Sequence, residues 1–476
     1  MDSQWLILFF INLCLIISVV FLERKKQGEA LLWVTILSFL PIYGILLYFI
    51  FGSTVGIKLA YKIRDRRLNE RYRQMAVKQL THLREERLSA AVSEENEWNN
   101  LAFFNLNYSH SVLTTKNRVK ILTTGMSNYK NMFSDIQNAK ESIHILYYSI
   151  HNDEIGHFLI ELLTKKAREG LQIKVLYDGF GSFMTPSGMF LPLVRAGGSV
   201  KRIKPTMTHY RNHRKIVVID GLIGYTGGMN IGRKYINLDK KKKPWRDTQI
   251  RLEGDAVYAL QYFFMYDWFY ASAPSKVRLR KEQLAKLLPL HQIRDFLPCQ
   301  IVGSGADTDE EYIKMCYLKM IMSAKKKILL QSPYFIPDDT ILEAFKVAAA
   351  SGTEIIIMLP KEKASFFLNP VTNYYISQLL NYGIKVYLYH GYIHAKTLSI
   401  DGYATCIGTV NMDNRSLKID DEICAVFYDR AFTARHQRIF DEDLRHCEEM
   451  NYEAFRQRSR WERIKERFFL LFAPLM

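Results

Sequence analysis

Two short stretches of this chain carry the same pattern: His213-Arg-Lys-Ile-Val-Val-Ile-Asp-Gly221 and His394-Ala-Lys-Thr-Leu-Ser-Ile-Asp-Gly402. In both, a lysine follows the histidine by two positions, an aspartate by seven, a glycine by 14 and an asparagine by 17. A single His-x-Lys-x4-Asp match is expected by chance on the order of 0.05 times in a chain of this composition. Two copies with the same offsets therefore indicate a duplicated unit.

The chain around each copy repeats as well. Residues 139–178 and 324–360 each read as an apolar strand, a helical stretch, a glycine and a second apolar strand. A strand–helix–strand unit of this length predicts parallel strands with a helix across one face of the sheet. We therefore predict an α/β fold with two tandem domains, over residues 108–295 and 296–476.

Each motif reads as a strand that ends in an Asp-Gly turn, with strand interiors at Ile216–Ile219 and Thr397–Ile400. Because alternate side chains of a strand share a face, the histidine and lysine of each copy are expected to project together. Asp220 and Asp401 lie at the turn, where an aspartate side chain can hold the backbone of a hairpin. From spacing alone, we expect these aspartates to support geometry more than chemistry.

Paired histidines with two lysines and two asparagines suit phosphoryl transfer. The ammonium groups of Lys215 and Lys396 would neutralise non-bridging phosphate oxygens, and the amides of Asn230 and Asn411 would add donors. One imidazole can attack phosphorus while the other protonates the departing alkoxide and then deprotonates the incoming alcohol. Since the lysines supply the positive charge, we expect neither a metal nor another cofactor.

A nucleophilic imidazole needs its second nitrogen held, usually by a carboxylate. Glu422, which is 28 residues after His394, is the candidate in the second copy. Lys241 occupies the matching position of the first copy, so Asp247 is the candidate there if residues 239–244 are a local insertion. The sequence thus assigns one orienting carboxylate to each copy.

The N-terminal region contains two uncharged apolar runs. Trp5–Leu22 has 18 residues and Ala30–Phe51 has 22, which as helices would be about 27 and 33 Å long. Each matches the ~30 Å hydrocarbon core of a bilayer. We predict a two-helix transmembrane hairpin within residues 1–56. More basic residues follow the second run than lie between the two, so both ends of the chain are expected in the cytoplasm.

Composition is that of an ordinary globular protein, with 48% hydrophobic and 24% charged residues, which excludes a disordered or collagen-like chain. Six cysteines include no Cys-x-x-Cys pair, which argues against a zinc knuckle. The 65 Lys+Arg against 48 Asp+Glu give a formal net charge of +17 over 476 residues. Such a balance favours a polyanionic partner, either nucleic acid or an anionic membrane.

Part of this charge is concentrated next to the apolar runs. Residues 58–88 hold ten basic and four acidic side chains among 31 positions, with apolar residues at roughly helical spacing. We interpret residues 57–107 as a basic helical linker that contacts lipid headgroups, or alternatively as an ordinary solvated helix. A cluster of basic residues before Phe468 indicates a second membrane-surface contact near the C-terminus.

Together these motifs resemble the phospholipase D superfamily, in which the His-x-Lys-x4-Asp motif occurs twice per active site, and more narrowly the bacterial cardiolipin synthases. The resemblance covers nearly the whole chain, N-terminal hairpin included, and rests on residues 40–44, 48–52, 176–182, 212–215, 225–232, 245–247, 332–338 and 411–416. It implies two phospholipase D-like α/β/α sandwich domains with mixed sheets. It also implies transfer of a phosphatidyl group from one phosphatidylglycerol to another, with release of glycerol.

The resemblance further implies that His213 is the nucleophile and His394 the general acid and base, which the symmetric spacing by itself does not distinguish. The remaining members of the implied catalytic and phosphate-binding sets are Lys215, Lys396, Asn230, Asn411, Asp220 and Asp401. Asp420 is a departure, since asparagine is usual there, and it adds negative charge near the site.

Other functions of the same superfamily stay open. A hydrolase that releases phosphatidic acid would share every residue above, and a phosphatidylserine synthase would need a nucleotide-activated donor. A basic nuclease would suit the net charge but would not need two membrane spans, and a catalytically silent scaffold would not need intact paired motifs. We expect phosphatidylglycerol and anionic membrane lipids as partners, and no nucleic acid. The expected location is a bacterial plasma membrane, with the catalytic domains on its cytoplasmic side.

Overall fold

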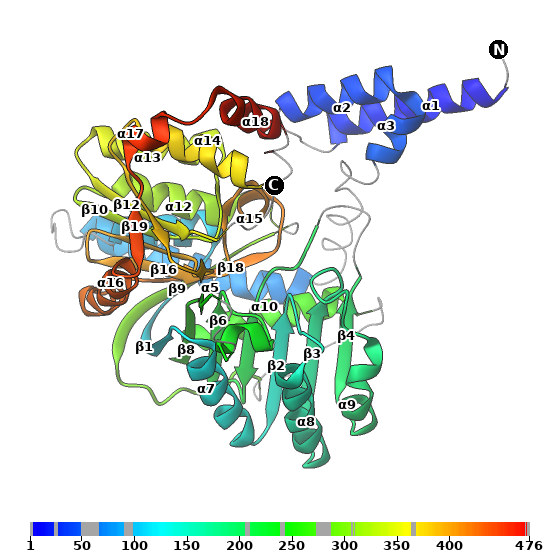
Figure 1. Cartoon of the computed structure of the whole chain (residues 1–476). Coiled ribbons are helices and arrows are strands. Elements are labelled where there is room, and N and C mark those ends of the chain that lie inside the picture. The colour runs from blue at the N-terminus through cyan, green and yellow to red at the C-terminus, as the bar shows by residue number, and fades with distance from the viewer. Residues whose placement is uncertain are drawn as a thin grey trace.

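The computed structural model describes residues 3–22, 27–48, 66–89, 99–204, 210–238, 243–272, 287–305, 308, 310–362, 368–471 and 473. Figure 1 shows two α/β domains, cyan to green and yellow-green to red, with three blue N-terminal helices projecting to one side. Several predictions concern residues that lie in part outside the described ones. These are residues 23–26 and 49–56 of the predicted hairpin, residues 57–65 and 90–98 of the linker, and residues 239–242 of the insertion.

The first repeat forms one half of the central sheet. Its strands are β1 (Leu113–Leu122), β2 (Ser142–Tyr147), β3 (Gln172–Asp178), β4 (Ser199–Ile203), β5 (Ile216–Ile219), β6 (Ile223–Gly227), β7 (Trp245–Arg246) and β8 (Gln249–Gly254). Its main helices are α7 (Gly125–Gln137), α8 (Glu154–Arg168), α9 (Leu191–Arg195) and α10 (Ala256–Tyr270). β2 and β3 are parallel and joined by α8, as the pattern predicts, whereas β5 is antiparallel to β2, so the sheet is mixed.

The second repeat has the same plan. Its strands are β9 (Phe296–Ser304), β10 (Lys327–Gln331), β11 (Phe335–Ile336), β12 (Glu354–Pro360), β13 (Lys385–Tyr389), β14 (Tyr392–Ile393), β15 (Thr397–Ile400), β16 (Ala404–Gly408), β17 (Met412–Asp413), β18 (Glu422–Phe427) and β19 (Cys447–Glu449). Its helices are α12 (Tyr312–Ser323), α13 (Asp339–Ala350), α14 (Leu368–Leu380), α15 (Asn414–Lys418), α16 (Arg430–Leu444), α17 (Tyr452–Arg456) and α18 (Arg460–Leu470). β10 and β12 are parallel and β15 is antiparallel to β10, which confirms the predicted duplication.

The two halves join into one sheet. Within the described ranges, 15 strands follow the order β19-β13-β12-β10-β15-β16-β18-β9-β1-β8-β6-β5-β2-β3-β4. β1 pairs antiparallel with β9, and the strand order runs outward from this junction in the same way on both sides. The sequence predicts the two domains but not this continuity. Pairing of the two edges leaves neither open to another chain.

Helices cover both faces of the sheet and bury its apolar residues. α7 and α8 enclose one core of the first repeat, and α12, α13 and α14 enclose that of the second. On the other face, α10 packs over β5 and β8 and also over β9, so its core takes in residues of both repeats such as Ile301 and Phe427. The two repeats therefore share part of one core.

The N-terminal region differs from the predicted pair of continuous spans. The first run forms α1 (Ser3–Ile17) and a π-helical turn (Ser18–Leu22), whereas the second divides into α2 (Gln27–Phe39) and α3 (Pro41–Leu47). A proline lacks the amide hydrogen and disfavours helical backbone at the residue before it, which explains the break at Leu40. In the part of the chain that the structure describes, no single helix has both the length and the hydrophobicity needed to cross a membrane.

The basic linker contains α5 (Arg66–Ser89), followed by α6 (Asn99–Ser109). Tyr72 of α5 stacks on Tyr262 of α10, with ring centroids 4.2 Å apart. Ala76 and Leu80 are buried against Leu106 of α6. The apolar side of this helix therefore packs against protein at these residues, and contact of its basic side chains with lipid headgroups stays a prediction.

Candidate active site

The two motif histidines are positioned by backbone of the opposite repeat. The amide of His213 donates to the carbonyl of Asp421 (2.9 Å), and the amide of His394 donates to the carbonyl of Arg246 (2.6 Å). The segments around these bonds run parallel: β14 pairs with β7, and Asn212 forms a bridge with Asp421. This pseudo-symmetric pairing brings the two motifs into one site at the junction of the repeats.

A buried carboxylate contacts each imidazole, and the pairs cross between repeats. Nδ1 of His213 lies 2.8 Å from Oε1 of Glu422, and Nδ1 of His394 lies 2.7 Å from Oδ2 of Asp247. The sequence names the right carboxylates, but the pairing within each repeat that it suggests is wrong. Because Nδ1 is engaged in both rings, Nε2 is the nitrogen left for chemistry.

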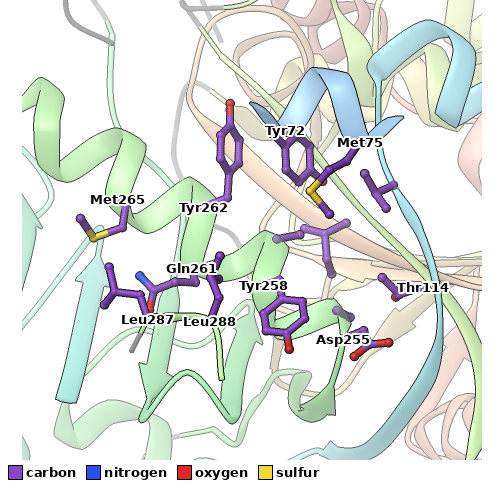
Figure 2. Close-up of a pocket in the computed structure, with 14 residues that line it drawn as sticks. Tyr72, Met75, Thr114, Asp255, Tyr258, Gln261, Tyr262, Met265, Leu287 and Leu288 are labelled. Atoms are coloured by element: carbon purple, nitrogen blue, oxygen red, sulfur yellow. The ribbon is translucent and has the colours of Figure 1, made fainter. Parts of the chain in front are cut away.

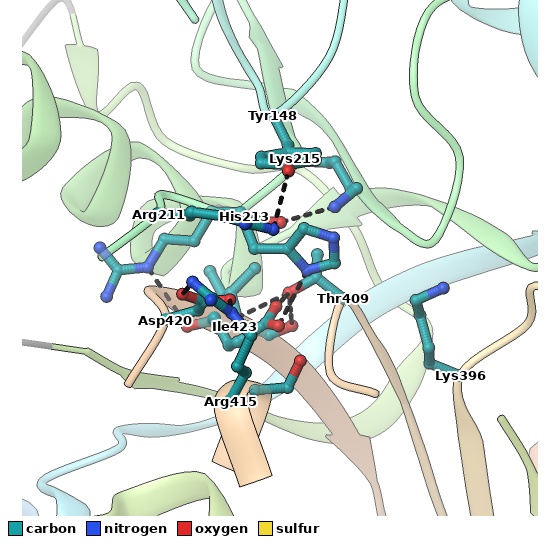
Figure 3. A network of polar contacts seen from close by, with 12 residues as sticks. Tyr148, Arg211, His213, Lys215, Lys396, Thr409, Arg415, Asp420 and Ile423 are labelled. Atoms are coloured by element: carbon teal, nitrogen blue, oxygen red, sulfur yellow. Dashed lines mark hydrogen bonds and ion pairs between the residues drawn. The ribbon is translucent and has the colours of Figure 1, made fainter. Parts of the chain in front are cut away.

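Both motif lysines are fully buried next to their histidines. Nζ of Lys215 donates to the carbonyl of His213 (2.7 Å), and Nζ of Lys396 donates to the carbonyl of His394 (2.6 Å). Figure 3 shows Lys215 above His213 and Lys396 to its right. The bond to the local backbone fixes each ammonium group and leaves its other hydrogens for a ligand.

Burial sets the protonation of the site. It lowers the pKa of both imidazoles well below the usual value, with the neighbouring lysines adding to the effect. It also lowers the pKa of Lys215 to about 7 and of Lys396 to about 8. In the same way it raises the pKa of Asp247 to about 6 and of Glu422 to about 7. A bound anion would favour the protonated lysines, so the site is suited to hold a phosphodiester.

The two asparagines differ in their contacts, although the sequence treats them as equivalent. The side-chain oxygen of Asn230 accepts from the amide of Ser149 (3.1 Å), and its nitrogen donates to the hydroxyl of Tyr235 (3.1 Å). Asn411 is also buried, but its side-chain oxygen has no hydrogen-bond partner among the described residues. Asn230 thus braces the frame, whereas Asn411 keeps hydrogen-bonding capacity for a ligand.

The structure does not bring the motif aspartates to the site. Asp220 accepts hydrogen bonds from the amides of residues 140–142 (2.7–2.9 Å), and Asp401 from those of residues 325–327 (2.7–2.8 Å). Both adopt a positive φ, 54° and 49°, at the tight turns after β5 and β15. Placing them in a catalytic set is therefore wrong by position. The expectation from spacing, that they hold backbone geometry, agrees with these contacts.

The matches to known protein families fall in the two repeats and in the N-terminal region. A family model described as "Cardiolipin synthase, PLD-like domain" matches residues 132–241 and 317–444, and one described as "Phospholipase_D-nuclease N-terminal" matches residues 7–53. The chain is 36% identical over 480 residues to "Cardiolipin synthase" of Listeria monocytogenes serotype 4a, covering 99% of this chain and 98% of that one. The chain belongs to the bacterial cardiolipin synthase family.

A second relative supports this membership of the cardiolipin synthase family, which is part of the phospholipase D superfamily. "Major cardiolipin synthase ClsA" of Bacillus subtilis is 37% identical over 492 residues, covering 100% of this chain and 99% of that one. As a member of this family, the chain is a phosphatidyltransferase. The solved phosphatidylserine synthase of Haemophilus influenzae aligns with a TM-score of 0.61 over 79% of this chain and 98% of its own, at 14% identity. At that identity the likeness shows a shared fold alone.

Around His213, this member of the cardiolipin synthase family has charged and polar neighbours, of which the sequence analysis named only Asp420. Arg415 pairs with Asp420 (3.0 Å), so the negative charge expected at Asp420 is neutralised. The ring of Tyr148 lies 4.8 Å from that of His213, and Nη1 of Arg211 donates to the Tyr148 hydroxyl (3.5 Å). Figure 3 shows Tyr148 above His213 in this view, Arg211 and Asp420 to its left and Arg415 below it.

The variable residue inside the first motif has a structural role. Arg214 is fully buried and binds both carboxylate oxygens of Asp267 in α10 (2.8 and 3.0 Å). Its Nε donates to the carbonyl of Glu422 (3.2 Å) and its Nη2 to that of Ser304 (3.1 Å). The second motif has Ala395 at this position. The arginine between His213 and Lys215, where the second motif has alanine, was the signal that could have identified this link between repeats.

Two further observations concern what the described residues could hold. No cluster of three or more His, Cys, Asp or Glu side chains in the described ranges has the arrangement of a metal-ligand set. A separate apolar cavity of about 310 Å³ lies between α5, α10 and the strands around Ile301, and none of the residues of the motif site lines it. Figure 2 shows Tyr72 and Met75 at one end of this cavity and Met265 at the other.

Proposed function

We propose that this protein synthesises cardiolipin in a bacterial membrane, by transferring a phosphatidyl group between two phosphatidylglycerol molecules through a phosphohistidine. The observation that carries the proposal is the pair of largely buried imidazoles. Each is held at Nδ1 by a carboxylate of the other repeat and flanked by a buried lysine. Family membership supports the choice of lipid, since both relatives named above are cardiolipin synthases.

In the first half of the proposed reaction, Nε2 of His213 attacks the phosphorus of the donor. The bond from phosphorus to the glycerol headgroup oxygen breaks, and His394 gives its proton to that oxygen, so glycerol leaves neutral. The carboxylate of Asp247 and the bound phosphodiester both favour the protonated form of His394 in this step. Lys215, Lys396 and Asn411 would hold the non-bridging oxygens.

In the second half, His394 accepts a proton instead of giving one, and His213 is the leaving group instead of the nucleophile. His394, now neutral, takes the proton from a headgroup hydroxyl of the second phosphatidylglycerol. The resulting oxygen attacks the phosphohistidine, the bond to Nε2 of His213 breaks, and cardiolipin forms. The low exposure of the two imidazoles, 12% for each side chain, supports transfer over hydrolysis because it limits the access of bulk water to the reacting nitrogens.

We further propose that the N-terminal helices insert in the membrane as a hairpin, with the catalytic domains on the cytoplasmic side. α1 and its π-helical continuation form one helical stretch without charged residues over residues 3–22. Its length is close to what is needed to cross a bilayer. Exposed apolar side chains of the N-terminal helices, including Phe21 at 75% and Phe39 of α2 at 81%, support a lipid environment.

The test is a product assay. Purified protein in phosphatidylglycerol vesicles should form cardiolipin and free glycerol in equal amounts. The rate should be the same with and without EDTA. Phosphatidic acid without cardiolipin would replace the synthase by the hydrolase alternative. Complete loss of turnover with EDTA would contradict a mechanism in which the lysines supply the positive charge. Salt-sensitive DNA cleavage in place of lipid turnover would favour the nuclease alternative.

A further inference from the structure

The last helix, α18, exposes an apolar stripe. Trp461, Ile464 and Phe468 of the helix, and Leu471 at its C-terminal cap, are 64%, 55%, 57% and 74% exposed. Their spacing of three and four residues puts them on one side, within an arc of about 80° at 100° per residue. Large apolar side chains aligned in this way mark a contact surface and not chance exposure.

The opposite side of α18 is fixed to the protein. Phe469 is buried in the core of the second repeat, where α18 packs on α14. The buried carboxylate of Glu466 pairs with Arg458 (3.0 Å), and Ser459 caps the helix start through a reciprocal bond with Glu462. The helix therefore cannot turn its apolar stripe inward without breaking these contacts.

Basic side chains flank the stripe. Arg460, Arg463 and Arg467 are exposed along one of its edges, and Lys465 along the other. Glu462, the exposed acidic residue of the helix, is engaged in the cap. An apolar centre between cationic edges complements the acyl boundary and the anionic headgroups of a bilayer, and each basic group near such a surface adds to binding.

The position of α18 connects this surface to the site. In the view of Figure 1, α18 and the N-terminal helices are both at the top of the molecule, whereas α16 is at the lower left of the second domain. Beyond the end of α18, the carbonyl of Ala473 accepts from the side chain of Asn414 (3.2 Å). Asn414 begins α15, three residues after Asn411 of the site.

We propose that α18 is an interfacial helix that docks on an anionic lipid bilayer and so holds the Asn411 side of the site toward the membrane. The apolar stripe lies at the acyl boundary and the four basic residues lie among the headgroups. The inference rests on the proposed membrane function for the identity of the partner, which is lipid. It rests on α18 itself for the surface.

The first test locates the helix in full-length protein without turnover. An environment-sensitive fluorophore is attached at Ile464→Cys in a Cys14→Ser background, in which the remaining cysteines are buried or half-buried. Asp441→Cys, an exposed position on α16, is the matched control. In vesicles that contain phosphatidylglycerol, the label at 464 should shift to shorter wavelength and resist an aqueous quencher, whereas the label at 441 should do neither. Equal quenching at both positions overturns the proposal.

The second test separates docking from catalysis. Arg463→Gln with Arg467→Gln should raise the lipid concentration needed for the fluorescence shift on the order of tenfold. An unchanged lipid concentration would contradict the headgroup contact. Ile464→Asp with Phe468→Asp should lower turnover about tenfold on vesicles but leave turnover of dispersed short-chain phosphatidylglycerol unchanged. Equal loss on both substrates, or none on vesicles, would count against docking. If the wild type made no cardiolipin at all, the proposed function would fail while the fluorescence test would still decide the position of α18.

Discussion

The two halves of the site have the same frame but different neighbours. Each histidine receives its backbone bond and its carboxylate from the opposite repeat, at nearly equal distances. Around His213 the further contacts are largely charged or polar, from Tyr148, Arg211, Arg415 and Asp420. Around His394 they are aromatic: Trp245 and Tyr392 lie 5.1 and 6.1 Å from its ring, and 4.6 Å from each other.

This difference indicates which features the duplication preserved and which the two repeats changed. The frame sets the position of the reacting nitrogens, which must be the same for attack and for proton transfer. The neighbours set polarity, and here they make one half suited to an anionic group and the other to stacking and steric exclusion of water. The carboxylates also follow this division. Glu422 accepts a hydrogen bond from Thr409. The first repeat has Gly228 at the position of Thr409, and a Cβ there would lie 2.0 Å from Asp247.

Loss of either imidazole should have the largest effect, and a change of donor should separate the halves. His213→Ala and His394→Ala are each expected to lower turnover at least ~10⁴-fold. A donor whose leaving group needs no proton should restore release of that group by His394→Ala but not by His213→Ala. Rescue of His213→Ala in its place would reverse the proposed roles.

Neutralising the carboxylates should have the next largest effect, because each fixes a ring and stabilises its charge. Glu422→Gln and Asp247→Asn should each lower kcat by about 10²–10³-fold with little change in KM. The donor with a good leaving group should relieve Asp247→Asn more than Glu422→Gln, as measured by initial rates of its release. Relief of both variants to the same extent would mean that the halves do not divide the chemistry.

The pH dependence should follow the buried groups. As pH falls through the pKa values of about 6 and 7 of Asp247 and Glu422, the orienting charges are lost, so kcat/KM should fall. As pH rises through the values of about 7 and 8 of Lys215 and Lys396, phosphate binding weakens and kcat/KM should fall again. The profile should be narrow, with its maximum near neutrality. The basic limb of kcat should lie at higher pH, since bound phosphate favours charged lysines; coincident limbs would contradict this.

The charged neighbours of His213 offer a smaller and more specific test. Arg415→Ala leaves Asp420 buried without its partner and should raise KM about tenfold. Asp420→Asn together with Arg415→Ala should recover most of the loss, because no unpaired charge remains. Trp245→Phe in the aromatic half should change KM by about threefold or less. A larger effect of Trp245→Phe than of Arg415→Ala would remove the contrast between the halves.

The motif aspartates should affect stability and not chemistry, and to the same degree in both repeats. Each accepts three backbone hydrogen bonds, so Asp220→Ala and Asp401→Ala should each cost on the order of 2 kcal/mol in the free energy of unfolding. Activity per folded molecule should stay within about twofold of the unchanged protein. Thermal unfolding in detergent and active-site titration measure the two quantities. A hundredfold loss of activity without destabilisation would return these residues to the chemistry.

The local part of this fold could be predicted from the sequence, and the pairing across the repeats could not. Apolar runs bounded by turns identify β5 and β15 residue by residue, because strand periodicity and Asp-Gly turns are local signals. The partnership of His213 with Glu422 spans 209 residues. Spacing within one repeat says nothing about which side chains meet when two repeats face each other. Arg415 and Tyr148 were missed for the same reason.

The joined sheet has a consequence for the order of events. The sheet continues from one repeat to the other through β1 and β9. A hinge motion that separates the two repeats would therefore break this strand pairing. In the proposed reaction, two bulky lipids would have to use one rigid site in turn. The second headgroup could then enter only the volume that departing glycerol has vacated. Strict alternation of donor and acceptor would thus be imposed by architecture, with no moving gate to enforce it.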